Sequence, residues 1–130
     1  MALLAALALC QPASARSDDD DKPNAELGAS EELQFVGTEI AWNGQVSAGR
    51  MVYKTQVAPA GESVPVQRAV GSGGVLFMGD LAQGSFIMLV KPGDCRDGLT
   101  GRNYPFTVEF RFAGSTLKGC GWSARRPYRG

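Results

Sequence analysis

The nine residues Tyr-Pro-Phe-Thr-Val-Glu-Phe-Arg-Phe, at positions 104–112, decide the fold class of this chain. Large apolar or aromatic side chains alternate here with Pro, Thr, Glu and Arg, and a strand places successive side chains on opposite faces of a sheet. One face of the strand would carry five large apolar groups, while the other would face water. Each such group contributes roughly 1.5–3 kcal/mol when fully buried, so we expect this strand to anchor the core.

Six further segments have the short length, apolar content and Gly-rich borders of strands. The dipeptide Asn43-Gly44 predicts a hairpin turn between the first two of them, and segment 85–91, apolar on both faces, predicts a central strand or one that lies under a loop. No segment has a sustained helical period. We therefore predict a small antiparallel barrel or half-barrel of about seven strands, with a small β-sandwich as the alternative. The further segments are 33–41, 46–57, 64–70, 75–81, 85–91 and 115–122.

The first 15 residues are interpreted as a signal peptide. Residues 2–9 are apolar but too short to span a bilayer, and the small residues Ala13 and Ala15 fit cleavage before Arg16. No positively charged segment precedes the apolar run, so we expect the true start to lie upstream. Cys10 could carry a lipid anchor, but Leu7-Ala8-Leu9 places a large Leu where lipoprotein processing favours a small residue. We therefore expect Cys10 to leave with the leader.

Residues 16–32 are predicted to form a flexible acidic linker because they are small, polar and without apolar periodicity. Residues 18–22 match the recognition sequence of enterokinase, but Pro23 would hinder cleavage there, and we interpret the run as a natural part of the linker. The β domain is expected to occupy residues 33–122, followed by a basic tail over 123–130. The acidic and basic clusters in these flanking segments are both interpreted as solvated.

Composition excludes several function classes. The chain has 13 basic and 13 acidic residues, a balance that argues against nucleic-acid binding. It has no histidine, which excludes a Ser-His-Asp or Cys-His pair and any His-ligated metal site. We predict no cofactor and no metal.

Cys95 and Cys120 are predicted to form a disulfide. They are the two cysteines left after leader cleavage, and an even pair in a small exported domain indicates a disulfide framework. A domain of roughly 90 residues is only marginally stable without such a covalent crosslink. The alternative, a redox-active or metal-binding pair, lacks a CxxC spacing and a partner histidine.

Two stretches of the chain form a recognisable pattern. The first is Phe35-Val36-Gly37-Thr38-Glu39, followed by Trp42. The second is Cys95-Arg96-Asp97-Gly98, followed by Tyr104-Pro105-Phe106 and closed by Gly119-Cys120. Together they resemble an uncharacterised family of small exported bacterial proteins and lipoproteins. The chain departs from the family pattern at Ile40-Ala41, where Pro-Phe is usual, at Arg96, and at Leu99-Thr100-Gly101, where Met-Ser-Asp is usual. The resemblance implies export and a fold over residues 35–122, but no established activity.

The candidate binding residues are those near the recognisable stretches. Asp97 and Glu39 could meet near the disulfide and hold a cation or ligand; alternatively, Asp97 caps its own turn and Glu39 pairs with Arg96 or Arg102. Trp42 and Trp122 could form an aromatic binding face, or they could pack over the barrel mouth. The full candidate set is Glu39, Trp42, Asp97, Arg102, Tyr104 and Trp122.

The first functional hypothesis is an exported, non-enzymatic binding or accessory module of the periplasm or cell envelope. Its expected partner is an envelope protein, such as an enzyme that it inhibits, with no nucleic acid and no transmembrane span in the mature chain. One alternative is a hydrolase-type enzyme that uses Asp97 and Glu39 as a carboxylate pair. The other is a carrier of a small apolar ligand, although Phe77, Phe86, Phe106 and Phe110 would leave little room inside the barrel.

Overall fold

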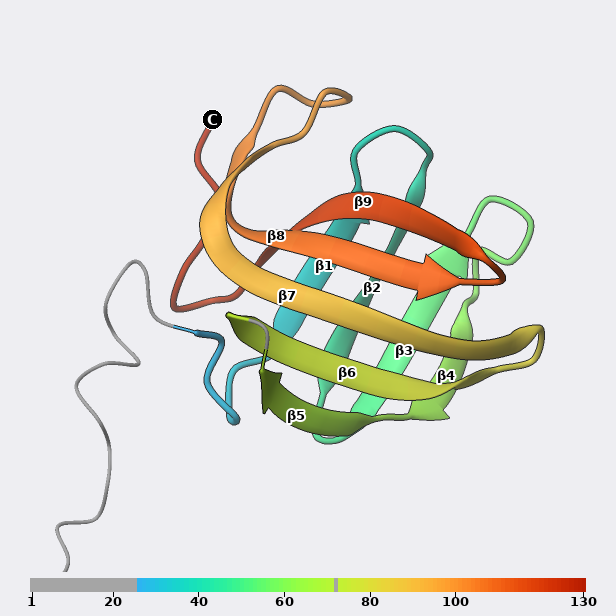
Figure 1. The fold of residues 1–130 in the computed structure, drawn as a ribbon. Coiled ribbons are helices and arrows are strands. Elements are labelled where there is room, and N and C mark those ends of the chain that lie inside the picture. Colours follow the sequence, from blue (N-terminus) through green and yellow to red (C-terminus); the bar gives the residue numbers. More distant parts are fainter. Residues whose placement is uncertain (1–25, 72) are drawn as a thin grey trace, which may run out of the picture.

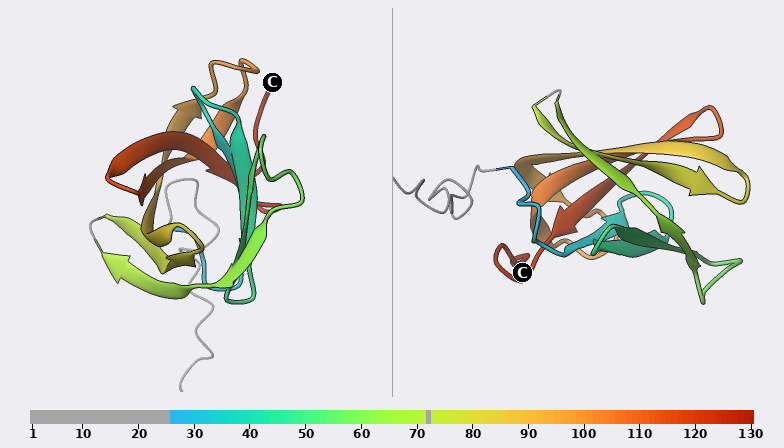
Figure 2. Two further views of the ribbon diagram at one scale, coloured as in Figure 1. Left: turned by 90° about the vertical axis from the view of Figure 1, so that its right-hand side faces the viewer. Right: turned by 90° about the horizontal axis from the view of Figure 1, so that it is seen from below.

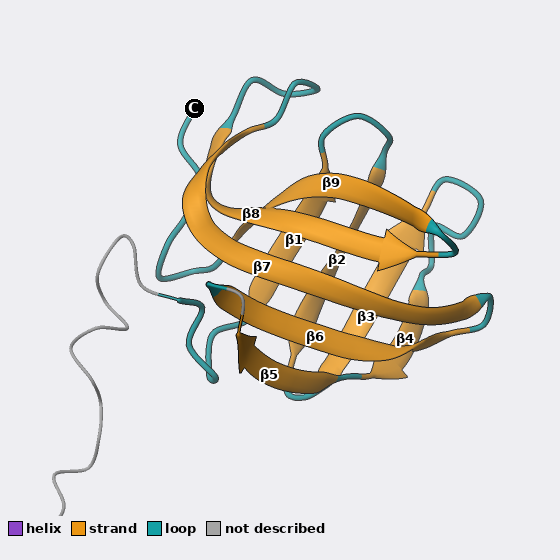
Figure 3. Cartoon of the chain, in the orientation of Figure 1, coloured by secondary structure: helices purple, strands orange, loops and turns teal. Residues whose placement is uncertain are grey.

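The computed structural model describes residues 26–71 and 73–130, and within these ranges every regular element is a β-strand (Figure 3). The predicted leader, Cys10 and the linker up to residue 25 lie outside the described residues. In the described part of the chain, no helix is long and apolar enough to cross a membrane. The strands are β1 (Leu33–Gly37), β2 (Trp42–Ser47), β3 (Arg50–Thr55), β4 (Glu62–Pro65), β5 (Gln67–Gly71), β6 (Gly74–Leu81), β7 (Gly84–Arg96), β8 (Asn103–Phe112) and β9 (Ser115–Trp122).

The strands form one antiparallel sheet that curves into a nearly closed barrel (Figures 1 and 2). Their order in the sheet is β4-β3-β2-β1-β9-β8-β7-β6-β5. Because β4 and β5 are consecutive in the chain and joined at Val66, the two edges of the sheet are brought together. In Figure 1, β7, β8 and β9 cross in front of β1, β2 and β3 at a steep angle. The predicted all-β barrel is confirmed, with nine strands in the described residues instead of about seven.

Strand β8 has the alternating burial that its sequence predicts. Phe106, Val108 and Phe110 are at most 1% exposed, and the strand pairs with β7 on one side and with β9 on the other. The ring of Phe110 packs against four other aromatic rings, which places β8 at the centre of the core. These rings belong to Trp42, Tyr53, Phe86 and Phe112.

The apolar segment 85–91 lies in the central strand β7, as predicted, between β6 and β8. Met88, Leu89 and Val90 are buried, but Ile87 remains 43% exposed on the outer face. The strand runs on to Arg96, beyond the predicted end, through an irregularity in its pairing between Pro92 and Cys95.

The predicted hairpin turn at Asn43-Gly44 is wrong. Both residues lie inside β2, and the turn between β2 and β3 consists of Ala48 and Gly49, with φ values of 50° and 76°. Positive φ at both central residues suits a tight hairpin. Gly44 is needed for close packing instead, because a Cβ there would lie 2.0 Å from the carbonyl oxygen of Val52 and 2.6 Å from the ring of Phe35. The segment predicted as one strand over 46–57 is therefore split between two strands, and the segment over 64–70 is likewise split between β4 and β5.

Two charged residues that were expected to be solvated are buried against each other. Glu31 is 9% exposed and Arg126 is 7% exposed. The Glu31 carboxylate accepts hydrogen bonds from Arg126 Nη2, from Ser123 Oγ at 2.7 Å and from the Gly28 amide at 3.1 Å. The Arg126 guanidinium lies over the ring of Phe106, 4.6 Å from its centroid. The solvated interpretation is wrong here because each charge finds its counterion inside the fold.

The packed domain also extends beyond its predicted first residue, 33. Leu27 is 1% exposed and belongs to the hydrophobic core. Its carbonyl accepts a hydrogen bond of 2.8 Å from Arg68 on β5, and the carbonyl of Glu26 accepts one of 2.9 Å from Arg126. The end of the predicted linker is therefore part of the folded domain.

Candidate functional site

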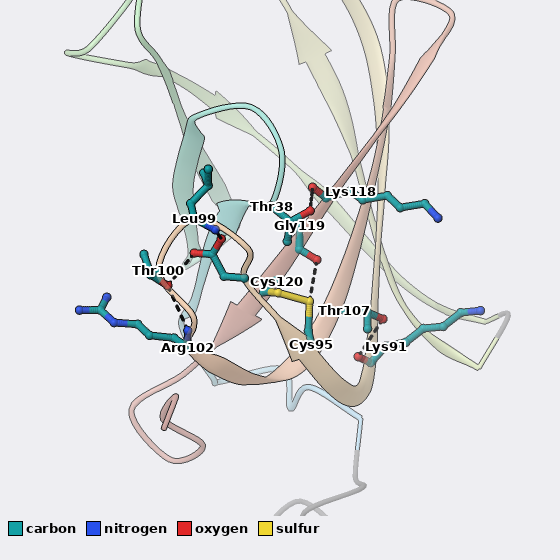
Figure 4. The surroundings of a disulfide bond; sticks show 11 residues. Thr38, Lys91, Cys95, Leu99, Thr100, Arg102, Thr107, Lys118, Gly119 and Cys120 are labelled. Carbon is teal, nitrogen blue, oxygen red and sulfur yellow. Dashed lines mark hydrogen bonds between the residues drawn. A yellow bond between two sulfur atoms is a disulfide. The ribbon is translucent and has the colours of Figure 1, made fainter. Parts of the chain in front are cut away.

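The predicted disulfide is confirmed, and it ties the end of β7 to β9 on the outside of the sheet (Figure 4). The Cα atoms of Cys95 and Cys120 are 5.6 Å apart, within the normal range for a disulfide. Cys120 is completely buried, whereas Cys95 is half-buried. The bond fixes the starting point of the loop that connects β7 to β8.

Asp97 organises that loop through its own side chain. One carboxylate oxygen accepts a hydrogen bond of 2.8 Å from the Leu99 amide, and the other accepts one of 2.9 Å from the Thr100 hydroxyl. The Asp97 amide donates to the carbonyl of Arg102, which closes the loop. Asp97 is 2% exposed. This geometry is that of the turn-capping alternative, in which the carboxylate stabilises its own backbone.

Glu39 does not share this environment. It is exposed in the turn between β1 and β2. Arg102, one of its two predicted partners, instead places its guanidinium 4.4 Å from the ring centroid of Tyr128. Within the described residues, no group of three acidic, cysteine or histidine side chains could hold a metal ion. The arrangement gives Asp97 and Glu39 different surroundings, one internal and hydrogen-bonded, the other solvated.

Three of the candidate residues belong to an aromatic cluster at the ends of β8 and β9. The ring of Tyr104 lies 5.2 Å from that of Trp122 and 5.3 Å from that of Tyr128. Trp122 and Tyr128 meet edge to face at 5.4 Å, a favourable geometry for aromatic pairs. Arg102 completes the cluster from the other side of Tyr128. Tyr128 was missed in the sequence, where it lies between the arginines of the predicted basic tail.

Trp42 packs into the core and does not form an exposed aromatic face. Its indole is 3% exposed and contacts the rings of Phe35 and Phe110. Gly37 and Gly119 make room for it, because a Cβ at either position would lie within 2.4–2.8 Å of indole atoms. The edge of this buried ring forms part of the wall of a surface cleft.

That cleft has a volume of about 270 Å³ and brings Trp42, Asp97 and Trp122 together. Its walls come from β1 and β2, from the turn that Asp97 organises, and from the end of β9. The turns on its two sides approach each other, since a Cβ on Gly98 would lie 3.8 Å from the carbonyl oxygen of Thr38. The lining residues are Gln34, Phe35, Val36, Gly37, Ala41, Trp42, Asn43, Gly44, Asp97, Leu99, Thr100 and Trp122.

Each of these two turns exposes one large apolar side chain. Leu99, which lines the cleft, is 58% exposed, and Ile40, which precedes the lining residue Ala41, is 63% exposed. Neither residue was a candidate in the sequence. The signal was present, because apolar side chains in the turns 38–41 and 97–101 have no strand face on which to be buried.

Further surface hollows lie elsewhere on the described part of the barrel, two of them similar in size to the cleft or larger. One, of about 440 Å³, lies over the junction of β4 and β5 and includes Ile87. The other, of about 240 Å³, lies at the barrel mouth beside Tyr53 and Phe112, and burial raises the pKa of the Tyr53 hydroxyl there. The interior is filled by the phenylalanines expected to fill it. Phe77, Phe86, Phe106 and Phe110 are all at most 4% exposed.

Comparisons of the chain with protein-family models, with curated proteins and with solved structures found no match. The family resemblance described above therefore stays a prediction.

Proposed function

We propose that this protein is an exported, non-enzymatic binding module of the bacterial periplasm or cell envelope, which holds a protein partner in the cleft beside the disulfide. The observation that carries the proposal is the pair of exposed apolar side chains, Ile40 and Leu99, on turns that flank an apolar cleft. Exposed apolar groups gathered around a concave surface are typical of protein-binding sites. A partner side chain that entered the cleft would contact Trp122 and the edge of Trp42.

The disulfide supports the exported location. Such bonds persist in oxidising compartments and are rare in the cytosol. Here the bond holds the base of the turn that carries Leu99, so the cleft wall depends on it.

The surroundings of the two acidic candidates favour binding over catalysis. Both Asp97 carboxylate oxygens already accept hydrogen bonds from Leu99 and Thr100, and the group is almost fully buried. A general acid or base must reach the reacting proton directly or through one water. The packing of the core phenylalanines likewise favours binding at the surface over carriage of a ligand inside.

The test uses the full chain, expressed in a bacterium that exports it, with a photo-crosslinking phenylalanine analogue at one of two exposed positions. Position 99 lies in the cleft wall, whereas position 57, where Val57 is 95% exposed, lies away from the cleft and serves as the matched control. We expect irradiation to give a discrete adduct with an envelope protein from position 99 and none from position 57. The substitution Ile40→Asp should abolish that adduct without changing the amount of folded chain.

Adducts of equal yield at both positions, or an adduct at position 99 that survives Ile40→Asp, would contradict the proposed surface. The absence of any adduct from position 99 in cells that export the chain would contradict the proposed function.

A further inference from the structure

The charges of this chain are segregated along its length although they sum to zero. Acidic residues gather before β1, at positions 18–21, 26, 31 and 32. Basic residues gather from the end of β7 onward, at positions 96, 102, 111, 118, 125, 126 and 129. The buried pair of Glu31 and Arg126 shows that the two regions meet in the fold.

Two exposed arginines flank an asparagine on the sheet near the C-terminus. Arg96 on β7 is directly opposite Asn103 on β8. Asn103 is in turn opposite Arg129, with backbone hydrogen bonds of 2.9 and 2.8 Å in both directions. Directly opposite residues of antiparallel strands project to the same face, with Cβ atoms about 4.5–5.5 Å apart. All three residues are exposed, so Arg96, Asn103 and Arg129 form one accessible row, which we call the arginine row.

The arginine row has the chemistry of a site for carboxylates. Two guanidinium groups flank a side-chain amide, so the row presents hydrogen-bond donors that match carboxylate oxygens. Arginine pairs with carboxylates in a fixed, bidentate geometry. Between its two ends, the row is wide enough for more than one carboxylate, because it crosses two strand spacings of about 4.8 Å each.

The acidic run is within reach of this row. The described chain begins at Glu26, whose carbonyl accepts a hydrogen bond of 2.9 Å from Arg126, only three residues before Arg129. A chain spans at most about 3.3–3.6 Å per residue, so the five residues from Asp21 to Glu26 can cover about 17 Å. Because the linker is short, its effective concentration at the row is high, of the order of millimolar.

We propose that the acidic run Asp18–Asp21 of this chain docks on the arginine row of the same molecule. The four consecutive carboxylates are the densest negative charge in the sequence, and their charge is complementary to that of the row. The contact lies at the surface, so it is screened by salt over a Debye length of about 10 Å at 0.1 M. This docking is independent of the function proposed for the cleft.

The test places an amine in the row without changing its charge. In the full chain, Arg129→Lys supplies a primary amine that a carbodiimide can join to a nearby carboxyl group as an amide. We expect a crosslink between position 129 and residues 18–21, mapped by mass spectrometry after digestion, at about 20 mM NaCl, and its loss at about 0.5 M NaCl. The native Lys118, exposed on β9, is the matched control. Its yield with the same residues should be at least about tenfold lower, because it lies outside the row.

A mixture of isotopically light and heavy chains separates intramolecular from intermolecular contacts. Crosslinks confined to chains of one isotope support docking within one molecule. Mixed-isotope crosslinks, equal yields at positions 129 and 118, or no crosslink at position 129 would each overturn the proposal.

A second measurement does not depend on the new lysine. Replacing all four residues Asp18–Asp21 by Asn should let the full chain bind a fluorescein-labelled hexa-aspartate peptide about tenfold more tightly, because the competing segment is lost. The added changes Arg96→Gln and Arg129→Gln should remove that gain. A matched variant with Glu39, Glu62, Asp80 and Glu109 changed to their amides alters net charge equally, and it should bind the peptide only slightly better than the parent chain. Equal gains for both sets of four substitutions would leave only a net-charge effect and would overturn docking.

Discussion

The substitution Glu31→Gln tests how far the buried ion pair holds the ends of the domain together. Glutamine keeps the shape of the side chain and removes its charge, so the buried Arg126 guanidinium loses its ion pair with Glu31. The Glu31 side chain is fully buried and that of Arg126 is 7% exposed, so solvent cannot compensate. Breaking a buried pair by removal of one partner costs about 3–5 kcal/mol. The Gln amide oxygen can still accept from the Gly28 amide, and its NH2 group can donate to the Ser123 hydroxyl oxygen, so we expect a loss near the lower end, about 3 kcal/mol.

The assay is urea unfolding at pH 7, followed by tryptophan fluorescence. The matched control is Glu109→Gln, because Glu109 and Arg111 form an exposed pair 3.6 Å apart. Exposed pairs contribute about 0–1 kcal/mol, so this control should hardly change the free energy of unfolding. The double variant Glu31→Leu with Arg126→Met removes both charges and should recover much of the loss. A cost below about 1 kcal/mol for Glu31→Gln, or one no larger than that of the control, would refute the reasoning.

The same pair predicts the direction of the pH dependence. Burial raises the pKa of the Glu31 carboxyl group, but hydrogen bonds from Arg126, Ser123 and Gly28 outweigh it, so the pKa lies below its ordinary value of 4.5. A depressed pKa contributes stability above the unfolded-state value, and this contribution is lost as the pH falls through the folded-state value. The stability difference between the wild-type chain and Glu31→Gln should therefore shrink below pH 4.5. A stability difference between the two chains that stays constant from pH 7 to pH 3 would contradict the lowered pKa of Glu31.

Three further outcomes follow from the structure. Replacing Cys95 and Cys120 by Ala should lower the free energy of unfolding by about 3.5 kcal/mol, the loop-entropy value for a separation of 25 residues, and an unchanged urea midpoint would contradict this. Phe110→Ala should cost about 3–5 kcal/mol in the same assay, because the ring is completely buried among other aromatic rings, and a cost under about 1 kcal/mol would contradict the packing. Gly119→Ala would place its Cβ 2.4 Å from the Val36 carbonyl oxygen and 2.8 Å from the Trp42 indole, so it should displace the indole and shift its fluorescence to longer wavelength; an unchanged spectrum would refute the contacts.

The wrongly predicted hairpin turn shows that a local sequence signal can have two structural causes. Asn43-Gly44 has the composition of a hairpin turn, but Gly44 is needed where the ring of Phe35 crosses its strand. A glycine retained for packing and one retained for positive φ look the same in a sequence. The turn that forms, at Ala48-Gly49, contains a residue with no special preference for positive φ.

Only part of the candidate site was predicted from the sequence, because local patterns do not show which distant side chains meet. Trp42, Asp97 and Trp122 were chosen as neighbours of recognisable motifs, and the fold brings them to one cleft. Glu39 remained outside it, while Leu99 and Tyr128 were missed. Which of these side chains meet depends on the register of β1 against β9 and on the course of the 97–101 turn, and neither is encoded in a local pattern.

The sequence by itself determined the all-β class, the buried face of β8 and the disulfide, because side-chain alternation and the number of cysteines outside the predicted leader are local or compositional properties. Only the tertiary structure decided that Glu31 and Arg126 are buried, and that β4 and β5 bring the sheet edges together. The physical reason is that the counterion of a buried charge and the neighbour of an edge strand can come from any part of the chain that the fold brings close. Glu31 and Arg126 are 95 residues apart in the sequence, and no local pattern relates groups at that separation.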